Sequence, residues 1–413
     1  MKPAPPPIAN PWPRIFIGVC GSLLVFLAFL MWREKHEVKP AGEWEAAMAT
    51  HIRTATAPSA MEPILEAFAK TDWQYLSTNG ALLEKAASSN WKGDGSLDLQ
   101  RFAIPIQRIS RSAEIEADDF PATASAGIDR PLPDVERITA FTFMLLANAR
   151  QLLAAGHGDE AMHRLLELDA FAARFARPPE EASLASHLIA INGMDLAADA
   201  MLHVVQDSRP STATLRLAEA QLDVIAARYH PVIGSIHSDA DVYAKTIAEH
   251  SDSPDSLATA LQFFDSKLTV VEAHALASSI FADAAAFPAE NARVRRLIDA
   301  QLAMPLIDQK DHIDSAWAQK ATENRLVQRG VSQPSAVTVR EALMLARTRL
   351  LQLAIAARLR ENRHDLLDPF SGKSFGTMRG GYYSIGPDCV DQQGAKIYNP
   401  TAGIYSAGDI AVY

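Results

Sequence analysis

The chain has 413 residues, of which 48% are hydrophobic and 21% are charged, and its net charge at pH 7 is −10. This length and apolar content can bury a sizeable core and exclude a disordered chain, whereas the acidic balance argues against a protein that binds nucleic acid over its whole surface. Two cysteines exclude a disulfide scaffold and a cysteine-rich zinc module.

The chain begins with a proline-rich tail, residues 1–14, which cannot form a helix because proline lacks the donor N–H. Residues 15–32 are then apolar apart from Ser22, and as a helix they span about 27 Å, close to the hydrocarbon thickness of a bilayer. Trp12 and Trp32 mark the two ends, where interfacial aromatic residues are found. We therefore predict a transmembrane helix that contacts the lipid bilayer.

A cleaved signal peptide is the nearest alternative to an uncleaved anchor. The apolar run is longer than a signal-peptide core, and no small-x-small cleavage site follows closely, so an uncleaved signal anchor is favoured. The positive charges on its two flanks are nearly balanced and leave the orientation open. We favour the short tail inside and the bulk of the chain outside, with a cytoplasmic-facing adaptor as the alternative.

Residues 33–134 are predicted to form a helical segment followed by a linker, because residues 119–134 are rich in Ala, Pro, Asp and Ser. Residues 135–336 carry successive apolar stripes at helical spacing and are predicted to form helical hairpins. The turn from Gly156 to Asp159 contains two glycines free to adopt positive φ and joins the first hairpin. Ser253 and Pro254 mark another helix start. No fixed repeat length is present, so we predict an irregular array.

Residues 337–364 form the clearest amphipathic helix, with an apolar stripe that includes Leu343, Leu350 and Leu353. Arginines occupy the rest of its surface: Arg340, Arg347, Arg349, Arg358, Arg360 and Arg363. Such a helix could contact nucleic acid or anionic lipid. A solvated face paired with acidic neighbours is the favoured interpretation, since the protein as a whole is acidic.

The densest cluster of ligand-type residues in the helical body is His230, His237, Asp239 and Asp241, followed by His250 and Asp252. Histidine and carboxylate side chains bind zinc or iron, so a metal-dependent hydrolase is one hypothesis. We expect Pro231, Gly234 and Ser235 to interrupt the helix, however, and surface histidines near a helix end are the favoured interpretation. Asp195 falls on an apolar stripe, where a carboxylate needs a partner or must turn to the stripe's edge.

No phosphate-binding loop, nucleophile elbow, His-Glu-x-x-His or Cys-x-x-Cys motif occurs in the chain. We therefore predict that the protein is not an enzyme.

The composition changes at residues 365–413, which are rich in Gly, Tyr, Asp and Ser. Residues 374–378 and 382–385 are predicted strands joined by a tight turn, and residues 409–412 can add a third. The loop between them contains Asp388 and Asp391, and Asp409 follows it. Oxygen ligands on a glycine-containing loop are what calcium requires, although carboxylates are also common in turns.

The motifs Asp-Pro-Phe-Ser-Gly-Lys at 368–373, Tyr-Ser-Ile-Gly-Pro-Asp at 383–388 and Gly-Asp-Ile at 408–410 resemble the C-terminal part of the major pseudopilins of type II secretion systems. A comparable tail occurs in large helical single-span proteins of planctomycetes and verrucomicrobia that have no assigned function. The resemblance implies a calcium site at Asp388 and Asp409, with Asp391 nearby. Cys389 replaces the family's glycine, and the prepilin peptidase site is absent from the N-terminus.

Together these patterns predict a mainly α protein with an N-terminal transmembrane helix, an irregular array of helical hairpins and a small pseudopilin-like β module. We expect a single-pass protein of a bacterial inner membrane whose bulk is periplasmic. Its expected role is a non-enzymatic scaffold or an accessory of secretion or pilus-like machinery, with protein partners in the envelope and no nucleic acid. A periplasmic metal-dependent hydrolase is the alternative, and the sequence does not indicate an oligomeric state.

Overall fold

The computed structural model describes residues 59–88, 97–114, 134–176, 183–265, 268–309, 313–331, 334–363 and 365–412. The predicted proline-rich tail and the transmembrane segment at residues 15–32 lie outside the described residues, as does most of the predicted linker at 119–134. The described part is mainly helical and ends in a three-stranded sheet, which confirms the predicted fold class at that level.

The helices before the central bundle are α3 (Met61–Lys70), α4 (Trp73–Ala87) and α5 (Ala103–Glu114). The bundle helices are α6 (Val135–Ala154), α7 (Gly158–Ala173), α8 (Leu184–Asp207), α9 (Thr212–Arg228) and α16 (Pro334–Leu359). Between α9 and α16 lie α10 (Ile233–Glu249), α11 (Pro254–Phe264), α12 (Val270–Ile280), α13 (Phe287–Leu302), α14 (Ser315–Ala321) and α15 (Arg325–Gly330). The strands are β1 (Gly376–Met378), β2 (Gly381–Ser384) and β3 (Ile410–Val412).

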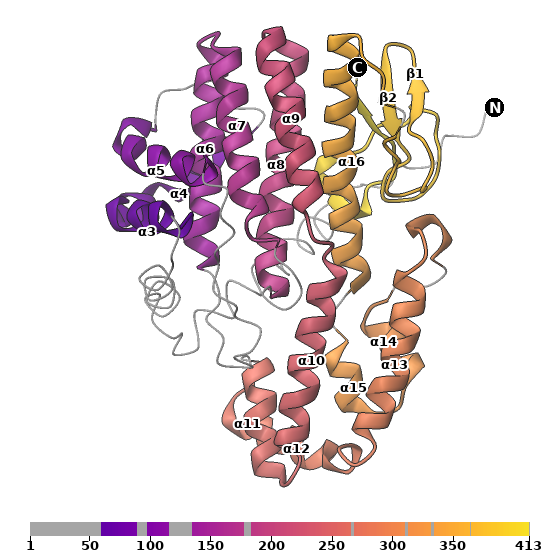
Figure 1. The fold of residues 1–413 in the computed structure, drawn as a ribbon. Helices are drawn as coiled ribbons and strands as arrows, with labels where there is room; N and C mark the ends of the chain where they lie inside the picture. Colours follow the sequence, from indigo (N-terminus) through magenta and orange to yellow (C-terminus); the bar gives the residue numbers. More distant parts are fainter. Residues whose placement is uncertain are drawn as a thin grey trace, which may run out of the picture.

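Five helices form the centre of the molecule: α6, α7, α8, α9 and α16 lie side by side (Figure 1). Helices α3 to α5 cover the side formed by α6 and α7, and the sheet packs against α16 at the opposite side. One continuous hydrophobic core runs through all of these elements, from Met61 in α3 to Val412 in β3. We call this part the main body.

The first predicted hairpin is confirmed as α6 and α7. The Asp134 side chain accepts a hydrogen bond from the backbone N–H of Arg137 and thereby caps α6. Gly156 has the predicted positive φ, of 84°, and ends the helix. Gly158 does not have one; a Cβ there would instead lie 2.4 Å from the Ser208 Oγ, so this glycine permits a close approach to the end of α8.

Helix α8 is the one described helix that is by itself long and apolar enough to cross a membrane. Its most apolar stretch is 61% buried within the protein, and the helix packs against α6, α7, α10 and α16. Gly193 allows the close contact with α7, since a Cβ there would lie 2.6 Å from the Cβ of Ala172. The central position in the bundle accounts for the apolar sequence of α8.

Helices α10 to α15 form a second core, centred on buried side chains such as Ile247, Leu257, Phe287 and Leu326. Helix α10 leads from the main body into this part, which extends below the bundle in Figure 1. The predicted helix start at Ser253 is confirmed, because its side chain accepts a hydrogen bond from the Ser256 N–H. We call this part the distal unit.

The C-terminal sheet has the order β1-β2-β3 with both pairs antiparallel, as the predicted strand–turn–strand pattern requires. Gly380 has a φ of 89° in the turn between β1 and β2. Phe370, Phe375 and Tyr398 from this module join the same core as the bundle helices. The module is therefore built into the main body.

Helix α16 ends at Leu359, a few residues before the predicted end at residue 363, and Arg360 follows with a φ of 62°. The expectation that its arginines form a solvated face is wrong for Arg347, which is only 7% exposed. Arg363 has the predicted acidic neighbours, because it forms ion pairs with Asp223 and Glu219.

Candidate functional site

The three carboxylates of the predicted calcium site come together around one loop of the C-terminal module, but their oxygens accept hydrogen bonds from the protein. The Asp409 carboxylate is fully buried and accepts from the N–H groups of Gln392, at 3.4 Å, and Gly394, at 2.6 Å. Asp388 accepts from the Val390 N–H at 3.2 Å and from the side-chain amide of Gln392 at 2.9 Å.

Asp391, the third carboxylate, accepts from the Gln393 N–H at 2.8 Å and from the Tyr383 hydroxyl at 3.0 Å. An ionised carboxylate offers about four acceptor positions, so these bonds occupy only part of the acceptor capacity of each residue. Across the described ranges, no group of three or more His, Cys, Asp or Glu side chains is placed to hold a metal ion. Calcium binding stays a prediction.

Burial raises the pKa of the Asp409 carboxyl, and the nearby charges of Asp391 and Asp388 add to this effect. The backbone donors at Gly394 and Gln392 act in the opposite direction. Cys389, which stands where the resembling family has glycine, adopts a left-handed φ of 54°. This conformation costs a non-glycine residue about 1–2 kcal/mol, and glycine avoids that cost because it has no Cβ. The cost would explain a glycine at this position in the family that the module resembles.

The centre of the C-terminal module is Asp368, which the sequence analysis did not single out as a site residue. Its carboxylate is 1% exposed and accepts from the Ser384 hydroxyl at 2.7 Å, the Ser371 hydroxyl at 2.9 Å and the Phe370 N–H at 3.2 Å. It thereby joins the turn before β1 to the end of β2. An aspartate directly before Pro-Phe-Ser-Gly is a turn signal, and that signal could have identified it.

The histidine and aspartate residues of the hypothetical hydrolase do not converge on one point in the structure. His237 Nε2 lies 2.9 Å from Asp299 Oδ1 on α13, whereas Asp241 forms an ion pair with Arg295. His250 contacts the Thr246 carbonyl at 2.9 Å. The expected interruption is confirmed at Pro231, since His230 and Pro231 lie between the end of α9 at Arg228 and the start of α10 at Ile233. It is wrong for Gly234 and Ser235, which lie in the first turn of α10.

A serine–histidine pair occurs elsewhere, at the junction of α8 and α10. The Ser235 Oγ lies 2.6 Å from His187 Nδ1, and His187 Nε2 lies 2.7 Å from the His230 carbonyl oxygen. Since a carbonyl only accepts, Nε2 carries the proton and Nδ1 accepts from the serine hydroxyl. Burial lowers the pKa of His187 to about 4, so the imidazole is neutral at pH 7.

This pairing has the polarity of a nucleophile and its base, but both side chains are fully buried. Their hydrogen bonds hold the start of α10 against α8. Two further hydrogen bonds hold the same junction. Glu341 of α16 accepts from the Tyr229 hydroxyl at 2.8 Å and from the Val232 N–H at 2.7 Å. The geometry is that of a structural junction between the main body and the distal unit.

A buried ion pair joins α16 to α8 inside the bundle, and its arginine also contacts the C-terminal module. Arg347 of α16 donates to the Asp195 carboxylate of α8 at 2.7 Å, and its guanidinium lies 5.2 Å from the ring centroid of Tyr398. Burial raises the pKa of Asp195, and Arg347 counteracts that shift. Burial also raises the pKa of Tyr398 to about 12. The partner that the sequence required for Asp195 is therefore Arg347.

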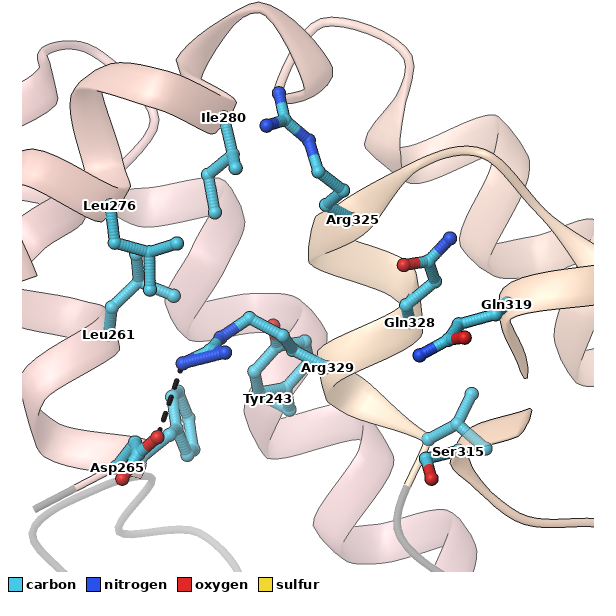
Figure 2. Close-up of a pocket in the computed structure, with 12 residues that line it drawn as sticks. Tyr243, Leu261, Asp265, Leu276, Ile280, Ser315, Gln319, Arg325, Gln328 and Arg329 are labelled. Atoms are coloured by element: carbon cyan, nitrogen blue, oxygen red, sulfur yellow. Dashed lines mark hydrogen bonds and ion pairs between the residues drawn. The ribbon is translucent and has the colours of Figure 1, made fainter. Parts of the chain in front are cut away.

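The distal unit contains a cleft of about 520 Å³ between the α11–α12 hairpin and helices α14 and α15. Leu261, Leu276 and Ile280 lie on one side of it, and polar residues of α14 and α15 lie on the other (Figure 2). Arg329 reaches across the opening toward Asp265, and the two side chains form an ion pair at 3.2 Å. The sequence analysis did not identify this cleft, because its residues come from five separate helices and their ends.

Comparison with known proteins adds no relative: no family model, no curated protein and no solved structure matches the chain.

Proposed function

We propose that the protein is a single-pass protein of a bacterial inner membrane whose helical body lies in the periplasm. There it serves as a non-enzymatic scaffold, or as an accessory of secretion or pilus-like machinery. The observation that carries this proposal is the core that the pseudopilin-like module shares with the helical bundle. The apolar segment at residues 15–32 supports the membrane anchor.

The shared core argues for a fixed structural module and against a polymerising pilin. Helix α16, which precedes the module, is covered by α8, α9 and α10 together with β2 and β3. A pilin packs its long helix against those of neighbouring subunits, and α16 has already used its apolar faces within one chain. Arg347 of α16, which is paired with Asp195 of α8, also lies 5.2 Å from the ring centroid of Tyr398 in the module.

The histidine, serine and carboxylate side chains described above also support a structural role. His187 and Ser235 are fully buried, and the carboxylates of the C-terminal loop accept hydrogen bonds from N–H donors of the same loop. Groups that act on a substrate need access to it and to one another. A scaffold uses such groups to hold its elements in register, which is what these contacts do.

The orientation is tested with a reporter enzyme that is active only outside the inner membrane, fused after residue 413. We expect activity in the intact bacterium, and an inactive but stably produced fusion would contradict the periplasmic placement. Replacing the segment 15–32 with an unrelated anchor of the same orientation is the matched control for the fusion's own folding.

The scaffold role is tested by placing a photo-crosslinking amino acid at Val390 or Tyr405, which are 55% and 63% exposed on the C-terminal module. We expect specific crosslinks to a component of the secretion or pilus machinery in the native membrane. Val224 on α9, 49% exposed, is the control position. The same products from all three positions, or none from the module, would contradict a docking role for it.

Metal analysis of the purified full-length protein separates this role from the hydrolase alternative. Bound zinc, iron or manganese that is lost in His230→Ala and His237→Ala variants would favour the hydrolase. A calcium titration monitored by melting temperature tests the predicted loop site, with Asp409→Asn as the variant that should lose any calcium-dependent stabilisation.

A further inference from the structure

The cleft of the distal unit combines a small volume with two chemically different walls. Its volume of about 520 Å³ lies within the range of small-molecule pockets, about 300–1,000 Å³, and leaves no room for a helix of several turns. The apolar wall consists of side chains from α10, α11 and α12: Tyr243, Leu261, Phe264, Leu276 and Ile280. An occupant must therefore present an apolar body to this wall.

The opposite wall carries hydrogen-bonding and cationic groups from α14 and α15. Its members are Ser315, Gln319, Arg325, Gln328 and Arg329. The charged lining residues are two arginines and Asp265, and each arginine forms an ion pair with an aspartate. Figure 2 shows Arg329 directed across the space below Leu261 toward Asp265.

The contact between Arg329 and Asp265 indicates which group of a ligand would bind there. The guanidinium of Arg329 leaves α15, crosses the cleft and meets a carboxylate on the far side at 3.2 Å (Figure 2). The two side chains are 34% and 42% exposed, and ion pairs with such exposure contribute little to stability. A ligand carboxylate can therefore replace Asp265 and meet the planar guanidinium with two parallel hydrogen bonds.

Arg325 is less available than Arg329. Its Nε donates to Asp283 at 3.0 Å, and its backbone N–H donates to the same oxygen at 3.1 Å. This arginine is held by Asp283 just beyond the end of α12. Arg329 is then the residue that can exchange its partner.

We propose that this cleft binds a small monocarboxylate with an apolar body, with Arg329 as the anion-binding residue and the Leu261–Leu276–Ile280 surface as the apolar wall. The ligand is either a free organic acid or the carboxyl end of a short apolar peptide, since both present the same chemistry. This inference is independent of the proposed scaffold role, because it concerns a different part of the molecule.

The test uses the full-length protein in lipid nanodiscs, with empty nanodiscs subtracted, and 4-phenylbutyrate as the probe. Isothermal titration is expected to show saturable binding of the acid. Two analogues should each bind at least fivefold more weakly than 4-phenylbutyrate: 4-phenylbutanol, which lacks the charge, and butyrate, which lacks the apolar phenyl group. N-acetyl-Leu-Phe represents a peptide carboxyl end, and its C-terminal amide is the uncharged control. Tighter binding of N-acetyl-Leu-Phe than of 4-phenylbutyrate would identify a peptide end as the ligand, and the reverse order would identify a free organic acid.

Two variants locate the site. Arg329→Gln should weaken binding of 4-phenylbutyrate at least fivefold, and Leu276→Glu should abolish it by placing a carboxylate on the apolar wall. The matched control is Arg216→Gln, which removes an exposed arginine of α9 that is paired with Glu361. This variant should leave the affinity for 4-phenylbutyrate unchanged. Melting temperatures establish that each variant is folded.

The inference is overturned if the acid and the alcohol bind the unaltered protein equally, a comparison that needs no variant. It is also overturned if Arg216→Gln weakens binding as much as Arg329→Gln does, or if no saturable binding occurs at about 5 mM acid, a concentration well above a millimolar dissociation constant.

Discussion

The main body contains buried charged residues that the cleft of the distal unit lacks. In the main body, Arg347 is 7% exposed and Asp169 is fully buried, and the ion pair of Arg347 joins α16 to α8. In the distal unit, ion pairs such as Arg329–Asp265 and Arg325–Asp283 lie at the surface, with side chains between about one fifth and one half exposed.

The difference separates charges that hold the fold from charges that can change partner. Removing one member of a buried ion pair lowers the free energy of unfolding by several kcal/mol, because the other charge is left in a medium of low polarity. An exposed pair is worth about 0–1 kcal/mol, so either member can exchange its partner at little cost. We therefore assign a structural role to the buried charges of the main body and a binding role to Arg329 of the cleft.

The largest expected effect is that of Arg347→Ala, which leaves Asp195 without its partner. We expect the free energy of unfolding to fall by about 3–5 kcal/mol in denaturant titrations. The double variant Arg347→Met with Asp195→Leu should recover much of this loss. Arg216→Ala, whose side chain is 64% exposed, is the control and should change stability by less than about 1 kcal/mol. Similar losses from Arg347→Ala and Arg216→Ala would remove the distinction between buried and exposed ion pairs.

The second effect concerns Asp169, whose two oxygens have no hydrogen-bond partner. Burial raises its pKa to about 7, above the value of about 3.9 in an unfolded chain. The folded state thus binds more protons between these values, so this residue's contribution to stability decreases as the pH rises from 4 to 7.

We expect Asp169→Leu to remove that decrease and to raise stability by about 2–4 kcal/mol at pH 8. The matched control lies on the same helix: Asp159 accepts from the Ser211 N–H, and this bond lowers its pKa. Its contribution is present at neutral pH and is lost on acidification, so Asp159→Asn should destabilise above pH 5. Parallel pH profiles for the two variants would contradict this assignment.

A third prediction tests how tightly the C-terminal module is built. Gly386 has a φ of 72°, and a Cβ there would lie 2.3 Å from the Gly408 carbonyl oxygen. Gly386→Ala should therefore lower the free energy of unfolding by about 1–3 kcal/mol. Gly80→Ala in α4 meets no atom within 4 Å and should raise stability by about 0.5–1 kcal/mol. A neutral Gly386→Ala variant would indicate a loosely packed module.

The smallest effect on stability is expected from Arg329→Gln in the cleft. Because this ion pair is exposed, we expect a change in the free energy of unfolding below about 1 kcal/mol. The same variant should lose ligand binding, as described above. A large loss of stability would place Arg329 with the structural charges of the main body.

Local sequence signals predicted much of the helical architecture. The glycine turn at Gly156, the cap at Ser253 and the strand–turn–strand pattern around Gly380 each specify the backbone within a few residues. Contacts between distant residues could not be predicted in this way. Helical periodicity places Asp195 on an apolar face, but it does not identify a partner 152 residues away.

The candidate sites were predicted less well for the same reason. The loop acids Asp388, Asp391 and Asp409 do lie around one loop, yet the sequence could not show that backbone N–H groups occupy their oxygens. The cleft has no sequence motif, since its two walls are assembled from helices that meet only in the folded distal unit. The burial of Arg347 could not be predicted either, because the composition of the arginine-rich helix does not reveal which arginine is buried.

Hydrogen exchange on the full-length protein in nanodiscs tests the central claim that the C-terminal module is part of the main body. We expect peptides covering β2 and β3 to exchange with the same opening free energy as those of α16, and Arg347→Ala to reduce protection in all three together. Fast exchange in β2 and β3 while α16 stays protected would contradict the account, because the module would then be an independent appendage.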